Sequence, residues 1–167
     1  MNELNASIAL AVLTVVFLCW FWFAPGGVLA LRRRAGGELQ VDVRLAYSPG
    51  TLYRLLDAYG PTGRSSFRAM LLADMVFPAI YGAMLYLLGD ALAAVSPHAS
   101  GLAVAARSAA LAAAAFDYAE NFFLLHVLAH FDSRPTTSAR FAAIFTTAKM
   151  IAFVIAVTAL ISAWISA

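Results

Sequence analysis

The stretch SAALAAAAFDYAENFFLLHVLAHF, residues 108–131, decides the fold, because it is apolar over a membrane-spanning length and yet carries acidic groups. About 20 helical residues cross the hydrocarbon core of a bilayer. Asp117, Glu120 and Asn121 are related as i, i+3 and i+4, so they share one helix face. A charged residue at bilayer depth costs about 2.5–3.5 kcal/mol even on the milder insertion scales. The sequence therefore predicts a bundled helix with this polar face turned inward.

Three more apolar stretches of similar length accompany it, at residues 6–31, 69–89 and 141–167. The chain has 167 residues, of which 63% are hydrophobic and 12% charged, whereas soluble domains have about 25% charged residues. Its mean hydropathy is +0.82. We therefore predict one all-α membrane domain over residues 1–167, a four-transmembrane-helix bundle. Its helices are expected at residues 6–31, 67–90, 104–131 and 140–165.

The first apolar stretch is expected to be a retained anchor, because residues 1–5 are acidic rather than basic and arginines follow the stretch. It contains no charge, so we expect a packing and anchoring element. At Pro25, Gly26 and Gly27 the helix either kinks and continues to the arginines or stops before a short interfacial segment, and we favour the kink. The single cysteine, Cys19, excludes an intrachain disulfide and a CxxC redox pair.

The basic residues predict the orientation of the helices. Seven of the eleven lie between the first two helices: Arg32, Arg33, Arg34, Arg44, Arg54, Arg64 and Arg68. Arg134 and Arg140 lie between the last two helices, and the connection over residues 95–102 has none. By the positive-inside rule the two basic loops are cytoplasmic and both termini lie on the non-cytoplasmic side. We expect an integral protein of a bacterial inner membrane, in contact with membrane lipids.

Residues 39–60 predict a cytoplasmic interfacial segment between the first two helices. Apolar and polar residues alternate over 39–47, which favours a short extended run. Ser48 and Pro49 are typical of a helix start. The apolar residues that follow at helical spacing predict a short amphipathic helix lying in the interface: Leu52, Leu55, Leu56 and Tyr59. Gly60, Pro61 and Gly63 are expected to turn the chain into the second membrane helix.

Polar residues also occur inside the second and fourth membrane helices. Asp74 is followed seven residues later by Tyr81, on almost the same helix face, and Pro78 leaves the Asp74 carbonyl without its usual helical donor. Lys149 is the only charge in the fourth helix. Alanines spaced from it by whole heptads mark the helix-facing side: Ala142, Ala156 and Ala163. Lys149 should therefore point inward.

Counting along the helices places the four ionisable groups in the cytoplasmic half of the membrane, where they can converge. Full ionisation of Asp74, Asp117 and Glu120 around Lys149 would leave two surplus negative charges. A low-dielectric site does not hold that surplus unaided, so we expect a protonated acid or a bound cation or cationic ligand.

Other candidate groups receive plainer interpretations. His126 and His130 are spaced as metal ligands are, but their place near the interface favours hydrogen bonding, so no metal site is predicted. Arg64 and Arg68 are expected to bind lipid headgroup phosphates, or the phosphate of a substrate. No phosphate loop, dinucleotide fingerprint, nucleophile elbow or zinc-finger spacing occurs, so the sequence identifies no cofactor, and no nucleic-acid partner is expected.

The stretch DAYGPTGRSSFRAMLLADMVFPAIYG, residues 57–82, followed by FDYAENFFLL, residues 116–125, resembles a family of small uncharacterised bacterial four-helix integral membrane proteins. The resemblance covers residues 53–149. It implies that the family's signature positions fall here on Arg64, Asp74, Tyr81, Asp117, Glu120 and Asn121. It implies no activity.

The leading hypothesis is a membrane-embedded enzyme that acts on a lipophilic isoprenoid, sterol-like or lipid substrate by general acid/base chemistry. Asp117 or Glu120, faced by Lys149, would donate a proton, Asp74 and Asn121 would orient it or stabilise a cationic intermediate, and Tyr81 would relay a proton. One alternative is a proton- or cation-coupled transporter or channel, which needs a homo-oligomer because four helices are few. Another is a structural or accessory subunit whose polar network only fixes packing.

Overall fold

The computed structural model of the chain describes residues 3–95 and 100–166, and that part of the chain contains helices and no strand. Residues 1–2 of the acidic N-terminus and residues 96–99 of the predicted arginine-free connection lie outside it. The long helices are α1 (Glu3–Phe23), α3 (Pro49–Asp74), α4 (Phe77–Val95), α5 (Ser100–Ala129) and α6 (Thr136–Ile165). Within the described residues, four helical segments are long and apolar enough to cross a membrane, as many as the sequence predicts.

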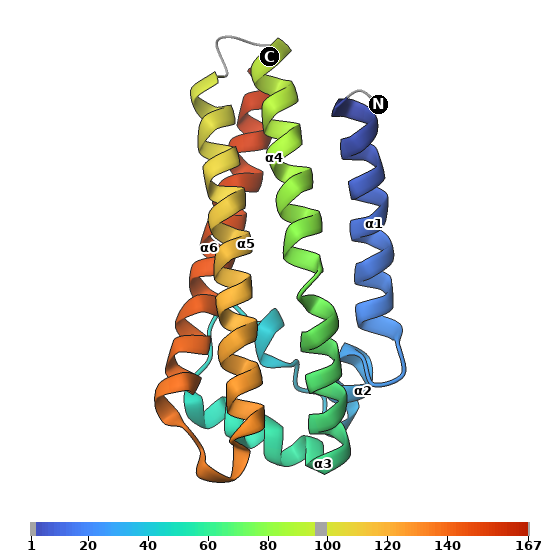
Figure 1. Cartoon of the computed structure of the whole chain (residues 1–167), viewed down its shortest axis with the longest axis vertical. Helices are drawn as coiled ribbons and strands as arrows, with labels where there is room; N and C mark the ends of the chain where they lie inside the picture. The colour runs from blue at the N-terminus through green and yellow to red at the C-terminus, as the bar shows by residue number, and fades with distance from the viewer. Residues whose placement is uncertain (1–2, 96–99, 167) are drawn as a thin grey trace.

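The helices α4, α5 and α6 pack side by side, and α1 stands next to α4 (Figure 1). Small residues let α5 and α6 approach closely, because a seam of buried alanines joins them. These are Ala103, Ala106, Ala110 and Ala113 on α5, with Ala152, Ala156, Ala159 and Ala163 on α6. The predicted small-residue stripe of α6, including Ala142, is indeed buried. The polar cluster described below lies on the same inner face.

The first membrane helix stops rather than kinks, so the favoured interpretation of Pro25–Gly27 is wrong. Helix α1 ends at Phe23, and a separate short helix, α2 (Val28–Arg34), follows. Gly26 has φ 94°, a conformation that disfavours any residue with a side chain, and a Cβ at Gly27 would lie 2.5 Å from the Phe21 carbonyl oxygen. The two glycines end α1 and place α2 beside the second half of α3 (Figure 1).

The predicted extended run over residues 39–47 is also largely absent. Val41–Val43 form a single 3₁₀ turn, η1, in which Val41 and Asp42 are buried together with the preceding Gln40. Leu45, an apolar position of the supposed alternation, is 74% exposed. The period-two pattern fails because this segment enters the bundle and buries consecutive residues on both sides of its backbone.

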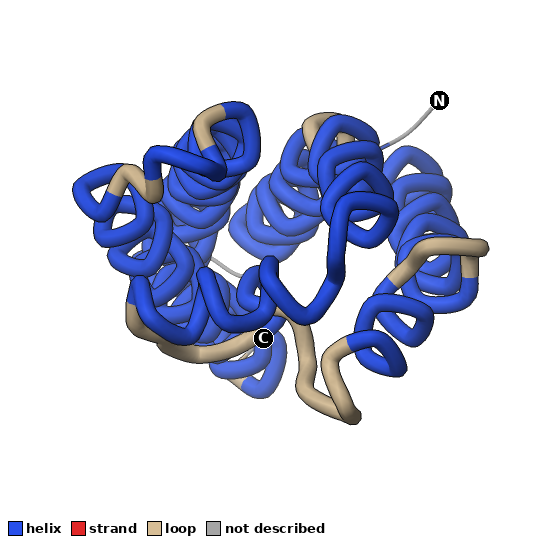
Figure 2. Tube along the Cα trace, turned by 90° about the horizontal axis from the view of Figure 1, so that it is seen from below, coloured by secondary structure: helices blue, strands red, loops and turns tan. Residues whose placement is uncertain are grey.

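The first half of α3 is the predicted amphipathic helix. Ser48 caps it, with the Thr51 amide donating to Ser48 Oγ at 3.1 Å, and its four apolar residues at helical spacing are all buried. Figures 1 and 2 show this part of α3 lying across one end of the bundle. At Gly60 the backbone has φ 64° and ψ −179°, and beyond it the chain rises into the bundle. The predicted turn is thus confirmed, and the membrane interface as its environment stays a prediction.

The second membrane segment is broken beside Asp74. Helix α3 ends at Asp74, Met75 and Val76 form a turn, and α4 begins at Phe77 with Pro78 in its first turn. Proline has no amide hydrogen and its ring clashes with the preceding helical turn, so a continuous helix is disfavoured there. The break confirms the expected loosening beside the carboxylate, and it is visible in Figure 1 between α3 and α4.

We predict that Gly60→Ala lowers the free energy of unfolding by about 1–3 kcal/mol, because its backbone region is almost exclusive to glycine. A Cβ at Gly60 would meet no atom within 4 Å, so the effect would be purely conformational. Gly101→Ala is the matched control, since Gly101 is helical and its Cβ would also meet open space. Equal stability of the two variants in detergent-solubilised unfolding experiments would contradict the prediction.

Candidate functional site

Lys149 of α6 is the centre of the polar cluster. Its Nζ lies 2.5 Å from Glu120 Oε2 and 3.1 Å from Asp117 Oδ1, both on α5, and it donates to the Asp42 carbonyl oxygen at 3.3 Å. Its hydrogen bonds go to Asp117 and to the Asp42 carbonyl, and Glu120 is its second ion-pair partner. The prediction that Lys149 points toward the acids is confirmed. One side chain thus connects α5, α6 and η1.

The other predicted acid, Asp74, joins the cluster from the break between α3 and α4. Asn121 Nδ2 donates to Asp74 Oδ2 at 2.8 Å, and Tyr81 OH donates to Asp117 Oδ2 at 3.1 Å. The five polar residues singled out around Lys149 by helix face and depth therefore meet in space. They are Asp74, Tyr81, Asp117, Glu120 and Asn121.

Thr146 of α6 is a member of the cluster that the sequence analysis missed. Its Oγ1 donates to Glu120 Oε1 at 2.5 Å and also lies 3.4 Å from Tyr47 OH. Thr146 is fully buried and stands three residues before Lys149, on the same side of the helix. That spacing was the available signal, but a lone threonine in an apolar helix usually bonds its own backbone, as Thr146 also does to the Ala142 carbonyl at 3.0 Å.

Asp42 of η1 is the more consequential omission, because it adds a fourth acid. Gln40 Nε2 donates to Asp42 Oδ2 at 3.0 Å, whereas Asp42 Oδ1 has no hydrogen-bond partner although the residue is only 5% exposed. Burial, reinforced by the Glu120 carboxylate, raises the pKa of the Asp42 carboxyl well above its usual range. No pattern in the sequence indicates that this loop enters the bundle, and the alternation over residues 39–47 predicts Asp42 on its polar face.

Four carboxyl groups therefore surround one ammonium group. Full ionisation of Asp42, Asp74, Asp117 and Glu120 would leave three uncompensated negative charges beside Lys149, one more than the sequence predicted. All four acids are buried. Such a surplus is stable only if acids are protonated or positive charge is supplied from elsewhere.

A cavity of about 270 Å³ lies beside this cluster, between α1, α4 and α6. Its polar end is formed by Asp42, Asp74, Tyr81, Asp117 and Lys149. Its walls are apolar and largely aromatic, with Phe17, Phe21 and Trp22 from α1, Phe77 from α4 and Phe153 from α6 among them. Helix α1 is therefore more than the anchor that the sequence predicted, because it supplies one wall of a cavity with a polar end.

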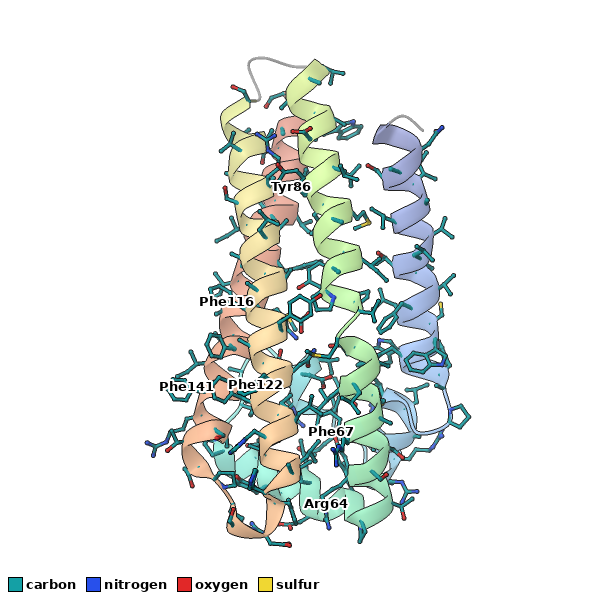
Figure 3. All side chains as sticks on the ribbon, in the orientation of Figure 1. Arg64, Phe67, Tyr86, Phe116, Phe122 and Phe141 are labelled. Atoms are coloured by element: carbon teal, nitrogen blue, oxygen red, sulfur yellow. The ribbon has the colours of Figure 1, made fainter. Side chains whose placement is uncertain are left out.

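The two predicted headgroup-binding arginines lie apart from this cavity. Arg64 is at the end of the bundle (Figure 3), where its guanidinium lies 4.0 Å from the centre of the Phe131 ring and donates to the Leu56 carbonyl at 3.2 Å. Arg68 is exposed, and neither arginine lines the cavity. His126 and His130 are likewise exposed, and among the described residues no group of three or more His, Cys, Asp or Glu side chains could hold a metal ion.

Ion pairs hold the segment that carries Asp42. Glu38 pairs with Arg44 at 3.0 Å and with Arg54 of α3, which clamps the two ends of the segment to each other and to α3. Hydrogen bonds from Arg54 and Arg44 lower the pKa of Glu38 to about 2. At the neighbouring corner, Arg134 pairs with Asp57 at 2.8 Å. The position of Asp42 thus depends on contacts outside the apolar core.

The described residues hold three acids, one lysine and one tyrosine at one end of an apolar cavity, with Glu120 behind them. Comparisons of the chain with protein-family models, with curated proteins and with solved structures find no match.

We predict that Lys149→Met lowers the free energy of unfolding by about 3–5 kcal/mol, because it leaves Asp117 and Glu120 buried without their positive partner. Arg140→Met is the matched control, since it removes an exposed cation from the same helix. The free energy of unfolding of both variants would be measured in mixed micelles by circular dichroism. A Lys149→Met protein as stable as the control would contradict a role for this ion pair in the fold.

We also predict that Glu38→Gln, which imitates the protonated acid, loosens residues 39–47 at neutral pH. Because the folded pKa is depressed, the clamp is fully present above the unfolded pKa of 4.5 and is lost as the pH falls toward about 2. Hydrogen exchange of these amides at pH 7 should be faster in Glu38→Gln than in the wild type. Asp132→Asn, at an exposed acid of another loop, should not change it.

Proposed function

We propose that the protein is an integral membrane enzyme that acts on a lipophilic substrate by general acid/base chemistry. The observation that carries the proposal is the cavity between α1, α4 and α6, which joins aromatic walls to a polar end with three carboxyl groups. Binding sites for small molecules are typically apolar concavities with a few convergent polar groups. The positions of the arginines favour a bacterial inner membrane with both termini on the non-cytoplasmic side.

The chemistry is assigned to the carboxyl groups that line the cavity. Asp74 is the preferred proton donor, because it makes no ion pair with Lys149 and its Oδ1 makes no hydrogen bond within the described residues. Asp42 is the second acid, with an unpartnered Oδ1. A proton given by one acid and a proton taken by the other would leave the proton count of the protein unchanged, as an isomerisation requires.

The remaining polar groups support these two acids. Glu120 does not line the cavity, so it is assigned to holding Lys149 rather than to proton transfer. Lys149 pairs with both acids of α5 and orients Asp117 and the Asp42 backbone. Tyr81 lines the cavity and donates to Asp117, so it is placed to relay a proton between Asp117 and a bound substrate.

The apolar seam between α5 and α6 favours an enzyme over a transporter formed by a single chain. Beyond the cluster, both helices meet through buried alanines, from Ala113 to Ala103 on α5 and from Ala152 to Ala163 on α6. An ion pathway needs polar or charged groups along its length. A transporter built from this chain would therefore place its pathway between copies in a homo-oligomer.

The proposal predicts that the wild-type protein changes a lipophilic molecule and that Asp74→Asn does not. Purified protein would be incubated with a lipid extract of a bacterial inner membrane, and the products compared by liquid chromatography and mass spectrometry. Asp132→Asn, at an exposed acid, should behave as the wild type. Native mass spectrometry of the same samples reports bound lipids and the oligomeric state.

Identical lipid profiles from the wild type, Asp74→Asn and a sample without protein would overturn the proposal. If the profiles are identical and the acid variants differ from the wild type only in stability, the polar network is structural. If Asp74→Asn keeps its thermal stability but no longer converts the lipid, the result supports an enzyme.

A further inference from the structure

The one cation at the polar end of the cavity, Lys149, is already paired with two acids, and this indicates what kind of ligand fits there. The hydrogen bonds of Lys149 go to Asp117 and to the backbone carbonyl of Asp42, and its second ion pair is with Glu120. Neither the Asp42 nor the Asp74 carboxyl receives a charged donor from the described residues, since their partners are the neutral amides of Gln40 and Asn121. Two acids beside the cavity therefore have only neutral hydrogen-bond partners.

A second observation, independent of the count of charges, comes from the hydrogen bonding of Asp42. Its Oδ1 is unpartnered, and the residue lines the cavity while 95% of it is removed from solvent. A buried oxygen without a partner costs about 1–3 kcal/mol or more, so it calls for an explanation, and a bound ion or ligand group is one. A positively charged hydrogen-bond donor would satisfy this oxygen and compensate its charge together.

The walls of the cavity favour the same ligand. Phe17 and Phe77 stack at 4.7 Å between ring centres, and Trp22 lines the cavity as well. Aromatic faces attract cations, most strongly where water is excluded. No arginine lines the cavity, and its single lysine is already paired with two acids, so an anionic headgroup would meet repulsion from three aspartates.

The volume of the cavity limits how much of the ligand can enter it. A volume of 270 Å³ is room for about nine groups the size of a water molecule or a methylene. Helix α1 packs on α4 and makes no extensive contact with α6, and the lining residues Leu18 and Phe153 are both 39% exposed. A longer apolar chain would therefore extend past these side chains into the surrounding hydrocarbon.

We infer that the cavity binds a lipophilic amine, with its protonated nitrogen held by Asp42 and Asp74 and its apolar chain against the aromatic walls. This inference rests on the proposed function and narrows its substrate to a class. The positive charge of the amine distinguishes this ligand from phosphorylated lipids, which are negative, and from alcohols of the same length, which are neutral.

Decylamine tests the inference, with decanol and decanoate as probes of the same chain length. The full-length protein would be titrated with each in detergent, and the bound fraction measured by native mass spectrometry. We expect saturable binding of decylamine at one site and at least about tenfold weaker binding of both other probes, because only the amine supplies a charged donor. Asp42→Asn should weaken decylamine binding about tenfold or more and leave decanol binding unchanged, whereas Asp132→Asn should alter neither.

Equal binding of decylamine and decanol, or decylamine binding that survives in Asp42→Asn, would overturn the inference. If Asp42→Asn does not fold, Asp74→Asn provides the same comparison, because it also removes an acid from the polar end. The inference and the proposed function fail separately. If the protein converts a neutral lipid but does not bind decylamine, only the assignment of an amine ligand is contradicted. If it binds the amine selectively but converts no lipid, only the proposed enzymatic function is contradicted.

Discussion

The ammonium group of Lys149 is the interaction on which the rest of the structure depends. It binds two acids of α5 and a backbone carbonyl of η1, so it fixes the rotation of α6 and draws the segment between α2 and α3 into the bundle. Charges cannot face hydrocarbon without a large cost, and this constraint decides which faces of α5 and α6 meet. The alanine seam then lets the two helices close along the same faces. Polar and apolar requirements therefore select one helix register.

Much of this arrangement was predictable, because membrane helices obey few rules. Asp117, Glu120 and Asn121 share a face by spacing alone, and Lys149 shares a face with the alanines of α6. Ser48, Gly60 and Pro78 act locally, through a cap, a special backbone conformation and a missing amide hydrogen, so they mark helix boundaries without knowledge of the tertiary fold. The resulting picture of a polar cluster inside four spans agrees with the helices and contacts of the structure.

The parts that could not be predicted are those decided by long-range contacts. Asp42 is buried because Lys149, more than a hundred residues later, binds its backbone, and the alternation of residues 39–47 carries no trace of that contact. Pro25 permits either a kink or a stop, and the outcome depends on the close approach of Gly27 to the Phe21 carbonyl. The cavity is still harder to predict, because it arises where α1 packs on α4 and stands away from α6. Spacing along a sequence does not encode such a gap.

The break between α3 and α4 has an electrostatic consequence of its own. Every α-helix carries partial negative charge at its carboxyl end, equivalent to about half an elementary charge, and α3 ends at Asp74 on the rim of the cavity. Helix α4 begins at Phe77, so the partial positive charge of its amino end lies beside this negative charge and offsets it. The backbone interruption thus leaves the free carbonyl and amide groups of two helix ends beside the cavity, a local dipole that no side-chain substitution removes.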